Sequence, residues 1–350
     1  MKGGDQNQDV AVHGFHYGRA RRTIGHYSSP KRTNSSWLAI LLPDPAVTAT
    51  PNPLTVDRLS GLLERFRIQA HLFHTGPLCG ITRFDQPHRG FLHVMREGSM
   101  SVTHQTKGLP RRLEIDKPSL LFYPRPAVHK FHNPPAEGSQ FSCATLEFAG
   151  GARNPLARAL PPLIVLPLAD VPGLAPALSL LFAETERVRC GQRLLADRLF
   201  EVVVIQLLRW MLDHPQQVGI QPGLITGLSD ARLSRALVAM HEAPGDNWNL
   251  EKMAACASMS RSAFAAAFRE VVGQTPADYL TDWRISLAQA RLRDGAQLKL
   301  LADELGYANP SALSRVFLAR VGQSPRDWLR AEQTVQSEQT EQSEQTAPAT

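Results

Sequence analysis

The sequence predicts an α+β fold, in which a β-rich body is followed by a helical segment and an all-helical C-terminal region. Short runs of β-branched and aromatic residues alternate with turns within residues 53–150. Two amphipathic stretches lie within residues 151–215, and one helical unit occurs twice within residues 230–331. These three observations divide the chain of 350 residues into at least two folded domains.

The two ends of the chain and the connection before the repeat lack such patterns. Residues 1–52 contain many Gly, Ser, Asn and Gln residues, and residues 332–350 repeat Ser-Glu-Gln-Thr, so both segments are predicted to be disordered. Translation from a later codon is an open alternative for the leader, residues 1–52. Residues 216–229 contain a break marked by Gly and Pro and are predicted to form a linker.

Five strands are predicted in the β-rich body, residues 53–150. Turns rich in Gly, Pro and Ser separate them. The predicted strands are residues 91–95, 100–104, 112–115, 120–123 and 141–148. Many short strands with regular turns are typical of a sandwich or a barrel.

Two helices are predicted in the helical segment, residues 174–186 and 194–213. The second carries a broad apolar stripe of Leu195, Leu199, Val202, Val203, Gln206 and Trp210. Such a stripe either covers the β-rich body or packs against its copy in another subunit. We expect the second arrangement, a homodimer through residues 173–213.

The C-terminal region contains one unit twice. The pattern of residues 262–280 returns 49 positions later in residues 311–329. Each copy follows a short amphipathic stretch and a polar break, which predicts helix, turn, helix in both. Ser260 and Asn309 are predicted to cap helices 261–272 and 310–321, and Gly273 and Gly322 to end them. A third helix, residues 277–294, connects the copies. The predicted core residues are Phe264, Phe268, Trp283, Leu313, Phe317 and Trp328.

Residues 231–330 resemble the DNA-binding domain of AraC/XylS-family transcription regulators. The second copy matches the family pattern most fully, at Leu301-Ala302, Leu305-Gly306-Tyr307, Ser311, Leu313, Arg315, Phe317, Gly322, Ser324-Pro325 and Trp328. The resemblance implies a cytoplasmic protein whose double helix-turn-helix binds double-stranded promoter DNA, usually as an activator that recruits RNA polymerase. The excess of 38 Lys and Arg over 32 Asp and Glu is mild for such a protein.

The resemblance also places candidate DNA contacts on both recognition helices. They are Arg261, Ser262, Ala265, Ala266 and Arg269 in the first copy, and Asn309, Ser311, Ser314 and Arg315 in the second. Alanine cannot make the bidentate contact that reads guanine, so Arg261 and Arg269 are expected on phosphates. We expect Arg315 to be the main base-reading residue, and a solvated surface charge is the alternative.

The segment from Pro124 to Asn133 resembles the second motif of the cupin barrel, with Pro126 where glycine is usual. Many AraC-type regulators carry a cupin-like sensor in this part of the chain. The first cupin motif is broken, because no His-x-His precedes Glu97-Gly98 and Phe91 stands where a ligand Glu is expected. We therefore expect neither a metal nor another cofactor, and we expect no enzymatic activity. The alternative is a cupin-type metal-dependent isomerase or dioxygenase with a helical appendage, and a protein-binding helical adaptor is a third reading.

The signal is expected to be a small-molecule effector or an oxidant that acts on the barrel. His129 and Asn133 are the effector candidates, although His129 is as readily explained as a wall residue bonded to backbone. Cys79 and Cys143 are the redox candidates, because a sensor thiol needs a lowered pKa and access. Arg125, His129 and His132 are expected to give Cys143 a positive neighbourhood. The four cysteines form neither a zinc pattern nor a disulfide framework, and no stretch is long enough to span a membrane.

Overall fold

The computed structural model describes residues 56–134 and 138–334, with the side chain of residue 152 left aside. The described residues belong to one compact unit that begins at Pro53. The predicted leader, residues 1–52, and residues 335–350 of the predicted tail lie outside the described residues.

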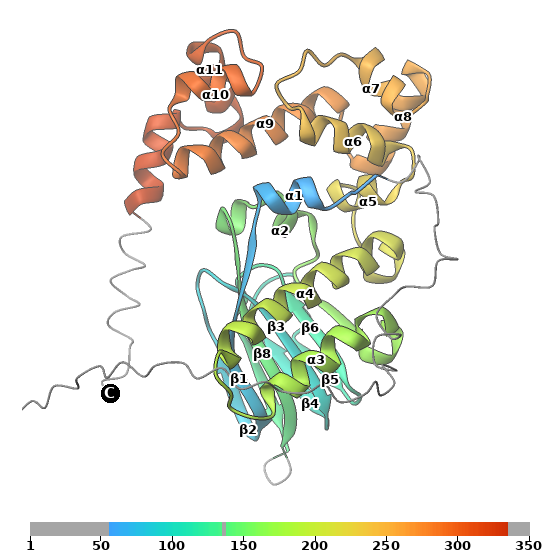
Figure 1. Cartoon of the computed structure of the whole chain (residues 1–350), viewed down its shortest axis with the longest axis vertical. Coiled ribbons are helices and arrows are strands. Elements are labelled where there is room, and N and C mark those ends of the chain that lie inside the picture. The colour runs from blue at the N-terminus through green and yellow to red at the C-terminus, as the bar shows by residue number, and fades with distance from the viewer. Residues whose placement is uncertain (1–55, 135–137, 335–350) are drawn as a thin grey trace, which may run out of the picture. The chain divides into compact units, whose positions relative to one another are not determined.

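The N-terminal domain consists of two antiparallel sheets (Figure 1). The first has the strand order β1 (Ile68–Leu78), β8 (Ser139–Phe148), β3 (Gly90–Glu97), β6 (Ser119–Tyr123), β9 (Ile164–Pro167). The second has the order β2 (Gly80–Phe84), β7 (His129–Asn133), β4 (Met100–His104), β5 (Arg112–Ile115). Within the described ranges, no strand of one sheet pairs with a strand of the other. The α+β class with an N-terminal β-sheet domain is confirmed, and the described strands of this domain form two facing sheets that do not close into one continuous barrel.

The five predicted strands are all present. The bounds of β4 and β5 agree with the prediction, whereas β3, β6 and β8 each extend further. Four strands, β1, β2, β7 and β9, were not predicted as strands. β9 lies after the predicted end of the β-rich body at residue 150 and pairs with β6.

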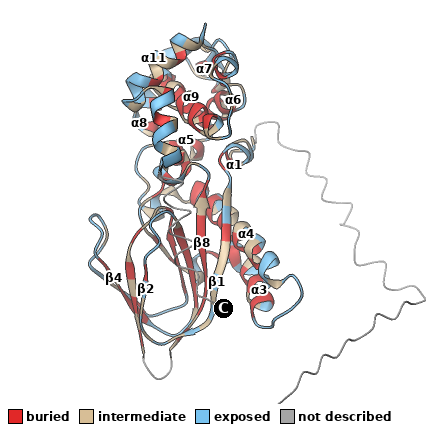
Figure 2. Ribbon diagram, turned by 90° about the vertical axis from the view of Figure 1, so that its left-hand side faces the viewer, coloured by how far each residue is buried: buried red, intermediate tan, exposed pale blue. Residues whose placement is uncertain are grey.

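Two apolar cores lie on opposite faces of the five-stranded sheet. In β3, Phe91, His93 and Met95 face the second sheet, while Leu92 and Val94 belong to the core on the helical side. That side is covered by α3 (Ala175–Thr185) and α4 (Gln192–Asp213). Strands β3, β6 and β8 are buried along most of their length, whereas the edge strand β1 is mostly half-buried or exposed, as a comparison of β8 with β1 in Figure 2 shows. Burial on both faces explains why these three central strands contain nearly continuous apolar runs.

The apolar stripe predicted on α4 is partly wrong. Leu199 and Val203 are buried, but Leu195 and Val202 are 46% and 42% exposed. The buried face of α4 consists of Ala196, Leu199, Phe200, Val203, Val204, Leu207, Leu208, Met211 and Leu212. Two hydrogen bonds set this rotation of the helix. Asp197 Oδ1 accepts from Leu72 N at 2.6 Å, and Glu201 Oε1 accepts from Ala70 N at 3.4 Å, both on the edge strand β1.

The C-terminal region is entirely helical within the described residues. Its helices are α5 (Leu224–Ser229), α6 (Leu233–Glu242), α7 (Leu250–Cys256), α8 (Arg261–Val272), α9 (Pro276–Arg293), α10 (Leu298–Glu304) and α11 (Pro310–Val321), followed by a helical segment over residues 325–334. α8 and α11 have the predicted bounds. All six predicted core residues are buried. α5 lies inside the predicted linker and buries Leu224, Ile225 and Leu228.

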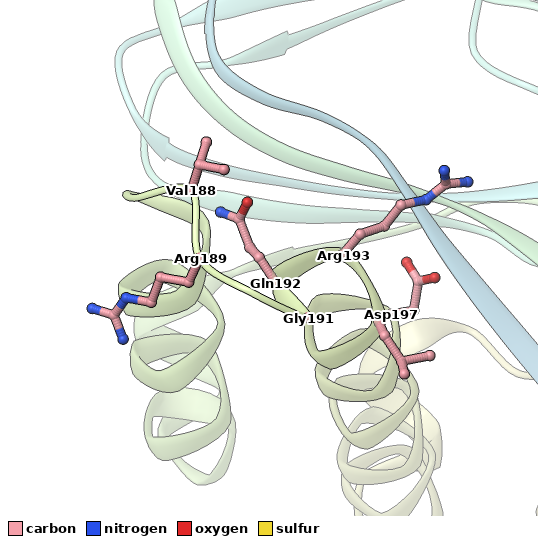
Figure 3. A pocket seen from close by; sticks show the side chains of 7 residues that line it. Val188, Arg189, Gly191, Gln192, Arg193 and Asp197 are labelled. Atoms are coloured by element: carbon pink, nitrogen blue, oxygen red, sulfur yellow. The ribbon is translucent and has the colours of Figure 1, made fainter. Parts of the chain in front are cut away.

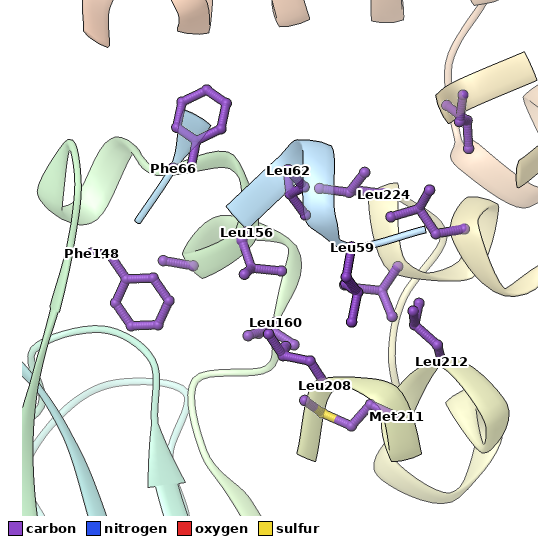
Figure 4. Close-up of a cluster of buried hydrophobic side chains, with 14 of the residues drawn as sticks. Leu59, Leu62, Phe66, Phe148, Leu156, Leu160, Leu208, Met211, Leu212 and Leu224 are labelled. Atoms are coloured by element: carbon purple, nitrogen blue, oxygen red, sulfur yellow. The ribbon is translucent and has the colours of Figure 1, made fainter. Parts of the chain in front are cut away.

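Two short helices and one loop of the N-terminal domain contact the C-terminal helices. Leu59 and Leu62, in and beside α1 (Ser60–Arg65), share one apolar cluster with α2 (Pro155–Ala159), α4 and α5 (Figure 4). Phe66 lies edge-on against Trp283 of α9, with ring centroids 5.2 Å apart. Arg153 forms an ion pair with Glu332, which also pairs with Arg293 at the end of α9. Glu332 was predicted to begin the disordered tail, and it is held by both arginines.

Candidate nucleic-acid interface and effector site

The first helix-turn-helix unit consists of α7 and α8. Ser258 follows α7 in the left-handed conformation, with φ of 54°. Ser260 then caps α8, because its hydroxyl accepts from Ala263 N at 3.3 Å, and Gly273 ends that helix. The predicted N-cap and C-terminal stop are both confirmed.

The second unit, α10 and α11, has a turn that is one residue longer. Gly306 takes the left-handed position, with φ of 73°, and Asn309 Oδ1 accepts from Ala312 N at 2.9 Å. Pro310 is the first residue of α11, where its missing N–H costs no hydrogen bond, and Gly322 ends the helix. The side-chain oxygen of Asn309 is therefore used as a cap.

The predicted contacts on α8 differ in accessibility. Arg261, Ser262, Ala266 and Arg269 are exposed, whereas Ala265 is half-buried. In the described part of the chain, the two arginine side chains have neither an ion pair nor a hydrogen bond. Two unpartnered guanidinium groups on an exposed helix are suited to phosphate oxygens.

On α11, Arg315 and Ser311 are exposed and Ser314 is half-buried. Arg315 has no side-chain partner among residues 56–134 and 138–334. Arg320, one turn further along, instead donates to Asp278 at 2.5 Å. Arg315 is thus a cation free to reach a base edge, and Arg320 is not.

Two further exposed cations were not among the predicted DNA contacts. Lys299 and Arg326 are exposed and, as far as the described chain extends, have no side-chain partner. The corresponding positions of the first copy hold Glu251 and Ala277. Alignment of the two copies position by position would have found this difference. The second unit therefore presents three free cations, Lys299, Arg315 and Arg326, toward solvent.

The interior of the sandwich holds a pair of histidines from facing sheets. His129 Nδ1 lies 2.8 Å from the carbonyl oxygen of Ala127, so this nitrogen carries the proton and donates. His129 Nε2 must then accept from His93 Nε2, 3.0 Å away. This assignment leaves His93 Nδ1 as an acceptor, and it is buried without a partner. The alternative reading of His129 as a wall residue bonded to backbone agrees with the contact to Ala127.

A second hydrogen-bonded pair lies beside the first. His104 Nδ1 donates to the carbonyl oxygen of Pro110 at 2.6 Å, and His104 Nε2 accepts from the Tyr123 hydroxyl at 2.9 Å. The Tyr123 ring stacks on His129 at a centroid distance of 4.2 Å. Burial lowers the pKa of His129 to about 4, lowers the pKa of His93 and His104, and raises the pKa of Tyr123. The cluster is therefore uncharged at neutral pH.

Asn133 and Cys143 also lie inside the domain. Both amide atoms of Asn133 are buried without a hydrogen-bond partner in the described structure. Burial raises the pKa of the Cys143 thiol well above its ordinary value. The expected lowering of the Cys143 pKa by Arg125, His129 and His132 is wrong, because the pKa is raised and burial is the cause. Cys79, by contrast, is exposed between β1 and β2.

The imidazoles of this cluster do not fit a metal ion. His93, His104 and His129 use every ring nitrogen in hydrogen bonds except His93 Nδ1, and no carboxylate joins them. Across residues 56–134 and 138–334, no group of three His, Cys, Asp or Glu side chains is arranged to hold a metal. The donor set of a catalytic cupin is thus not assembled in the described domain.

The surface of the helical segment carries a shallow hollow. It encloses about 600 Å³ and lies where α3 joins α4 (Figure 3). Val188, Arg189, Gln192, Arg193 and Asp197 are among its lining residues. None of the predicted effector or redox residues lines it. No described helix is both long enough and apolar enough to cross a membrane.

Comparisons with known proteins agree with both resemblances. The family model described as Cupin matches residues 57–213, and the model described as Helix-turn-helix domain matches residues 253–331. A putative AraC-like transcription regulator of Streptomyces antibioticus is 36% identical over 52% of this chain and 60% of its own length. The HTH-type transcriptional regulator AlkR of Acinetobacter baylyi is 32% identical over 50% of this chain and 58% of its own.

A third relative is similar over a longer region. The RCS-specific HTH-type transcriptional activator RclR of Escherichia coli is 26% identical over 67% of this chain and 82% of its own length. The matches to the first two relatives span about three fifths of those proteins. The chain thus joins an N-terminal part that matches the cupin model to a C-terminal part that matches the helix-turn-helix model, and it is similar to AraC-like transcription regulators.

Proposed function

We propose that this protein is a sequence-specific DNA-binding transcription regulator. The observation that carries the proposal is the pair of N-capped recognition helices, α8 and α11, which present Arg261, Arg269 and Arg315 without partners among the described residues. Unpaired guanidinium groups at such positions favour phosphate oxygens and guanine edges, the two contact types that bind and read duplex DNA. The names of the relatives, all of them regulators, support the same function.

The signal is proposed to enter through the cupin domain as a small effector or an oxidant. For an effector, the support is the unpartnered His93 Nδ1 and the unpartnered amide of Asn133, both of which are buried within the domain. Buried polar atoms without partners are costly, and a bound hydrogen-bonding ligand would satisfy them. For an oxidant, the exposed Cys79 is the better candidate, because the buried Cys143 thiol stays protonated.

The route from the sensor to the DNA-binding region is proposed to run through the middle and the C-terminal end of α9. Phe66 contacts Trp283 in its first half, and Arg153 bonds to Glu332, which also holds Arg293 at its end. An effector that changed how the sensor packs would act on α9 through these contacts. It would do so only by binding one packing more tightly than the other.

Three further properties belong to the proposal. The exposed apolar side chains of α3 and α4, Leu180, Leu194, Leu195 and Val202, support a homodimer through residues 173–213.

Recruitment of RNA polymerase, and hence activation, is supported by the name of the Escherichia coli relative, a transcriptional activator. We place the protein in the cytoplasm because its proposed partner, promoter DNA, is there.

The function is tested by selecting duplexes from a random-sequence DNA library with the full-length protein. We expect a recovered consensus, which the Arg315→Ala variant binds more weakly than the wild type. Metal analysis and a DNA mobility shift on the same preparation separate the alternatives. A bound stoichiometric metal without a shift would favour the cupin enzyme, and absence of both would favour a protein-binding adaptor.

A further inference from the structure

The two helix-turn-helix units contact each other directly, through the backbones of two glycines. Gly245 lies in the loop before α7, and Gly306 lies in the turn between α10 and α11. A Cβ atom on Gly306 would lie 2.3 Å from the carbonyl oxygen of Gly245, and a Cβ atom on Gly245 would lie 2.3 Å from the carbonyl oxygen of Glu304. Both distances are well inside van der Waals contact, so only glycine allows the loops to meet.

One arginine from the middle of α9 fastens this contact. Arg284 Nε donates to the carbonyl oxygen of Pro244 at 2.7 Å, and Nη2 donates to the carbonyl oxygen of Asp246 at 3.1 Å. These acceptors flank Gly245 on both sides. The same guanidinium lies 5.6 Å from the ring centroid of Tyr307, the residue after Gly306. A single side chain thus holds a loop of the first unit against the turn of the second.

A second tie joins the units at another place. Arg320, near the end of recognition helix α11, donates to Asp278 at 2.5 Å and lies 3.6 Å from Asp282. Both carboxylates belong to the first two turns of α9, directly after the first unit. Asp278 is itself held, because it accepts from the Thr275 hydroxyl at 2.6 Å. The recognition helix of the second unit is therefore attached to the start of the connecting helix α9, next to the first unit.

We propose that Arg284 and Arg320 are positioning residues for DNA recognition, which hold the two units as one rigid reading surface that accepts its two half-sites at only one separation. The inference rests on the proposed function, since it concerns the DNA that the protein binds. One base pair inserted between the half-sites moves one of them by about 3.4 Å and turns it by about 35°. A rigid surface loses contacts on such DNA, whereas two hinged units would follow the displaced half-site.

The test compares binding to duplexes of altered spacing. A duplex selected from a random library by the wild-type, full-length protein is prepared with zero, one or two base pairs inserted between its half-sites, and affinity is measured by fluorescence anisotropy. We expect one inserted base pair to weaken wild-type binding at least about tenfold, the cost of losing one good base contact. The double variant Arg284→Met, Arg320→Met should lose less than about threefold, because methionine keeps an unbranched apolar chain but removes the donors of both ties.

A matched control is available in the same region. Arg330 is exposed, and its side chain pairs with Asp327, three residues earlier, and with no other residue of the described chain, so it does not connect the two units. The Arg330→Met variant should lose as much affinity as the wild type when one base pair is inserted between the half-sites. Each variant is also measured on a duplex with only the half-site of the second unit, where wild-type affinity shows that this unit is folded. If the double variant fails there, the single variant Arg320→Met, which leaves Arg284 in place, takes over the comparison.

The outcomes are distinct. A folded double variant with the full tenfold penalty would show that α9 alone sets the spacing and would overturn the inference. Wild-type binding that is indifferent to inserted base pairs would overturn it as well. If the wild-type protein selects no duplex at all, the proposed function itself fails, and this inference falls with it.

Discussion

The two helix-turn-helix units share a framework and differ on the surface. Phe264 and Phe268 of the first are as completely buried as Leu313 and Phe317 of the second, 49 positions later. The exposed counterparts diverge. Position by position, Glu251, Ala266 and Ala277 of the first unit correspond to Lys299, Arg315 and Arg326 of the second. The difference teaches that the repeat preserves the core spacing but not the positions of the exposed cations. The first unit presents Arg261 and Arg269 where the second has Pro310 and Leu318.

The largest expected effect concerns the two turns. Gly306→Ala should lower the free energy of unfolding by at least about 3 kcal/mol, because it combines a strained backbone with a collision against Gly245. Ser258→Ala, at the matching position of the first unit, should change it by less than about 0.5 kcal/mol, because a Cβ atom is already accommodated there. Urea denaturation of both variants measures the difference. Equal losses would mean that the turns are equivalent and would break the comparison.

Base reading should depend on Arg315 more than on Arg269. Arg315→Ala should cost about 1 to 3 kcal/mol at the selected site and remove discrimination at one base position. Arg269→Ala should weaken binding to selected and random DNA about equally and reduce the salt slope by about one unit. Titrations at several salt concentrations measure both quantities. A uniform loss for Arg315→Ala would make that residue a phosphate contact.

Acidic pH should loosen the first unit before the second. Burial lowers the pKa of His241 to about 3, and its Nε2 lies 2.6 Å from the hydroxyl of Tyr279, whose ring contacts Phe268. The unfolded chain binds the proton at a pKa of about 6.5, so this stability is complete above pH 6.5 and lost as the pH falls toward 3. At pH 5 the loss amounts to about 2 kcal/mol.

The second unit has no such group. Trp328 takes the place of Tyr279 and packs on Phe317 with ring centroids 5.6 Å apart. Hydrogen exchange at pH 7 and pH 5 should therefore show a greater loss of protection in α8 than in α11. The His241→Phe variant should abolish this selective loss. Parallel losses in both helices of the wild type would instead point to a global effect of pH.

The difference between the two recognition helices should also produce different base preferences in the two halves of the DNA site. Saturation of the selected site should show stronger base preferences in the half read by residues 309–320 than in the half read by residues 260–272. Alanine at positions 265 and 266 can contribute at most contacts to thymine methyl groups, whereas the exposed Arg315 is proposed to read hydrogen-bonding edges. Sequence-dependent DNA shape reduces the contrast without reversing it. Equal base preferences in both halves would contradict the proposed division of roles.

The smallest expected effect is a gain in stability. Ser258 holds a left-handed φ of 54° that glycine adopts without strain. Ser258→Gly should therefore stabilise the first unit by about 1 kcal/mol. Thermal unfolding measures the change, and the Ser260→Gly variant in the neighbouring cap serves as the comparison, because it should not be stabilising. A loss of stability for Ser258→Gly would show that the serine side chain has a role of its own.

Sequence patterns predicted those helices whose first and last residues are determined by capping residues next to them in the chain. The bounds of α8 and α11 agree with prediction because Ser260, Gly273, Asn309 and Gly322 supply caps and stops within the elements themselves. Strand β1 was missed because it contains Gly76-Pro77, a pair typical of turns, and an irregular register between Leu72 and His74.

The candidate effector site was only half predicted. His129 and Asn133 lie in a recognisable motif, but His93, the partner of His129, is 36 residues away on the facing sheet. Only the packing of the two sheets brings His93 and His129 together, and no spacing pattern in the sequence predicts this contact. The exposed side of α4 was misassigned for the same reason, because the rotation of this helix depends on contacts with β1. The contact between Gly245 and Gly306 is likewise invisible along the chain.

The carboxylates of α4 also determine whether the edge strand β1 can pair with another chain. Strand β1 ends the five-stranded sheet, and an open strand edge is a template for pairing with another chain. Asp197 and Glu201 occupy the backbone donors of Leu72 and Ala70, so the helix seals that edge. Any movement that lifted α4 would break both of these part-buried hydrogen bonds and leave the two donors open to water or to another strand. A second subunit must therefore meet α4 on its outer face and leave the helix seated, and a mutation that loosened it would open a route to strand-mediated aggregation.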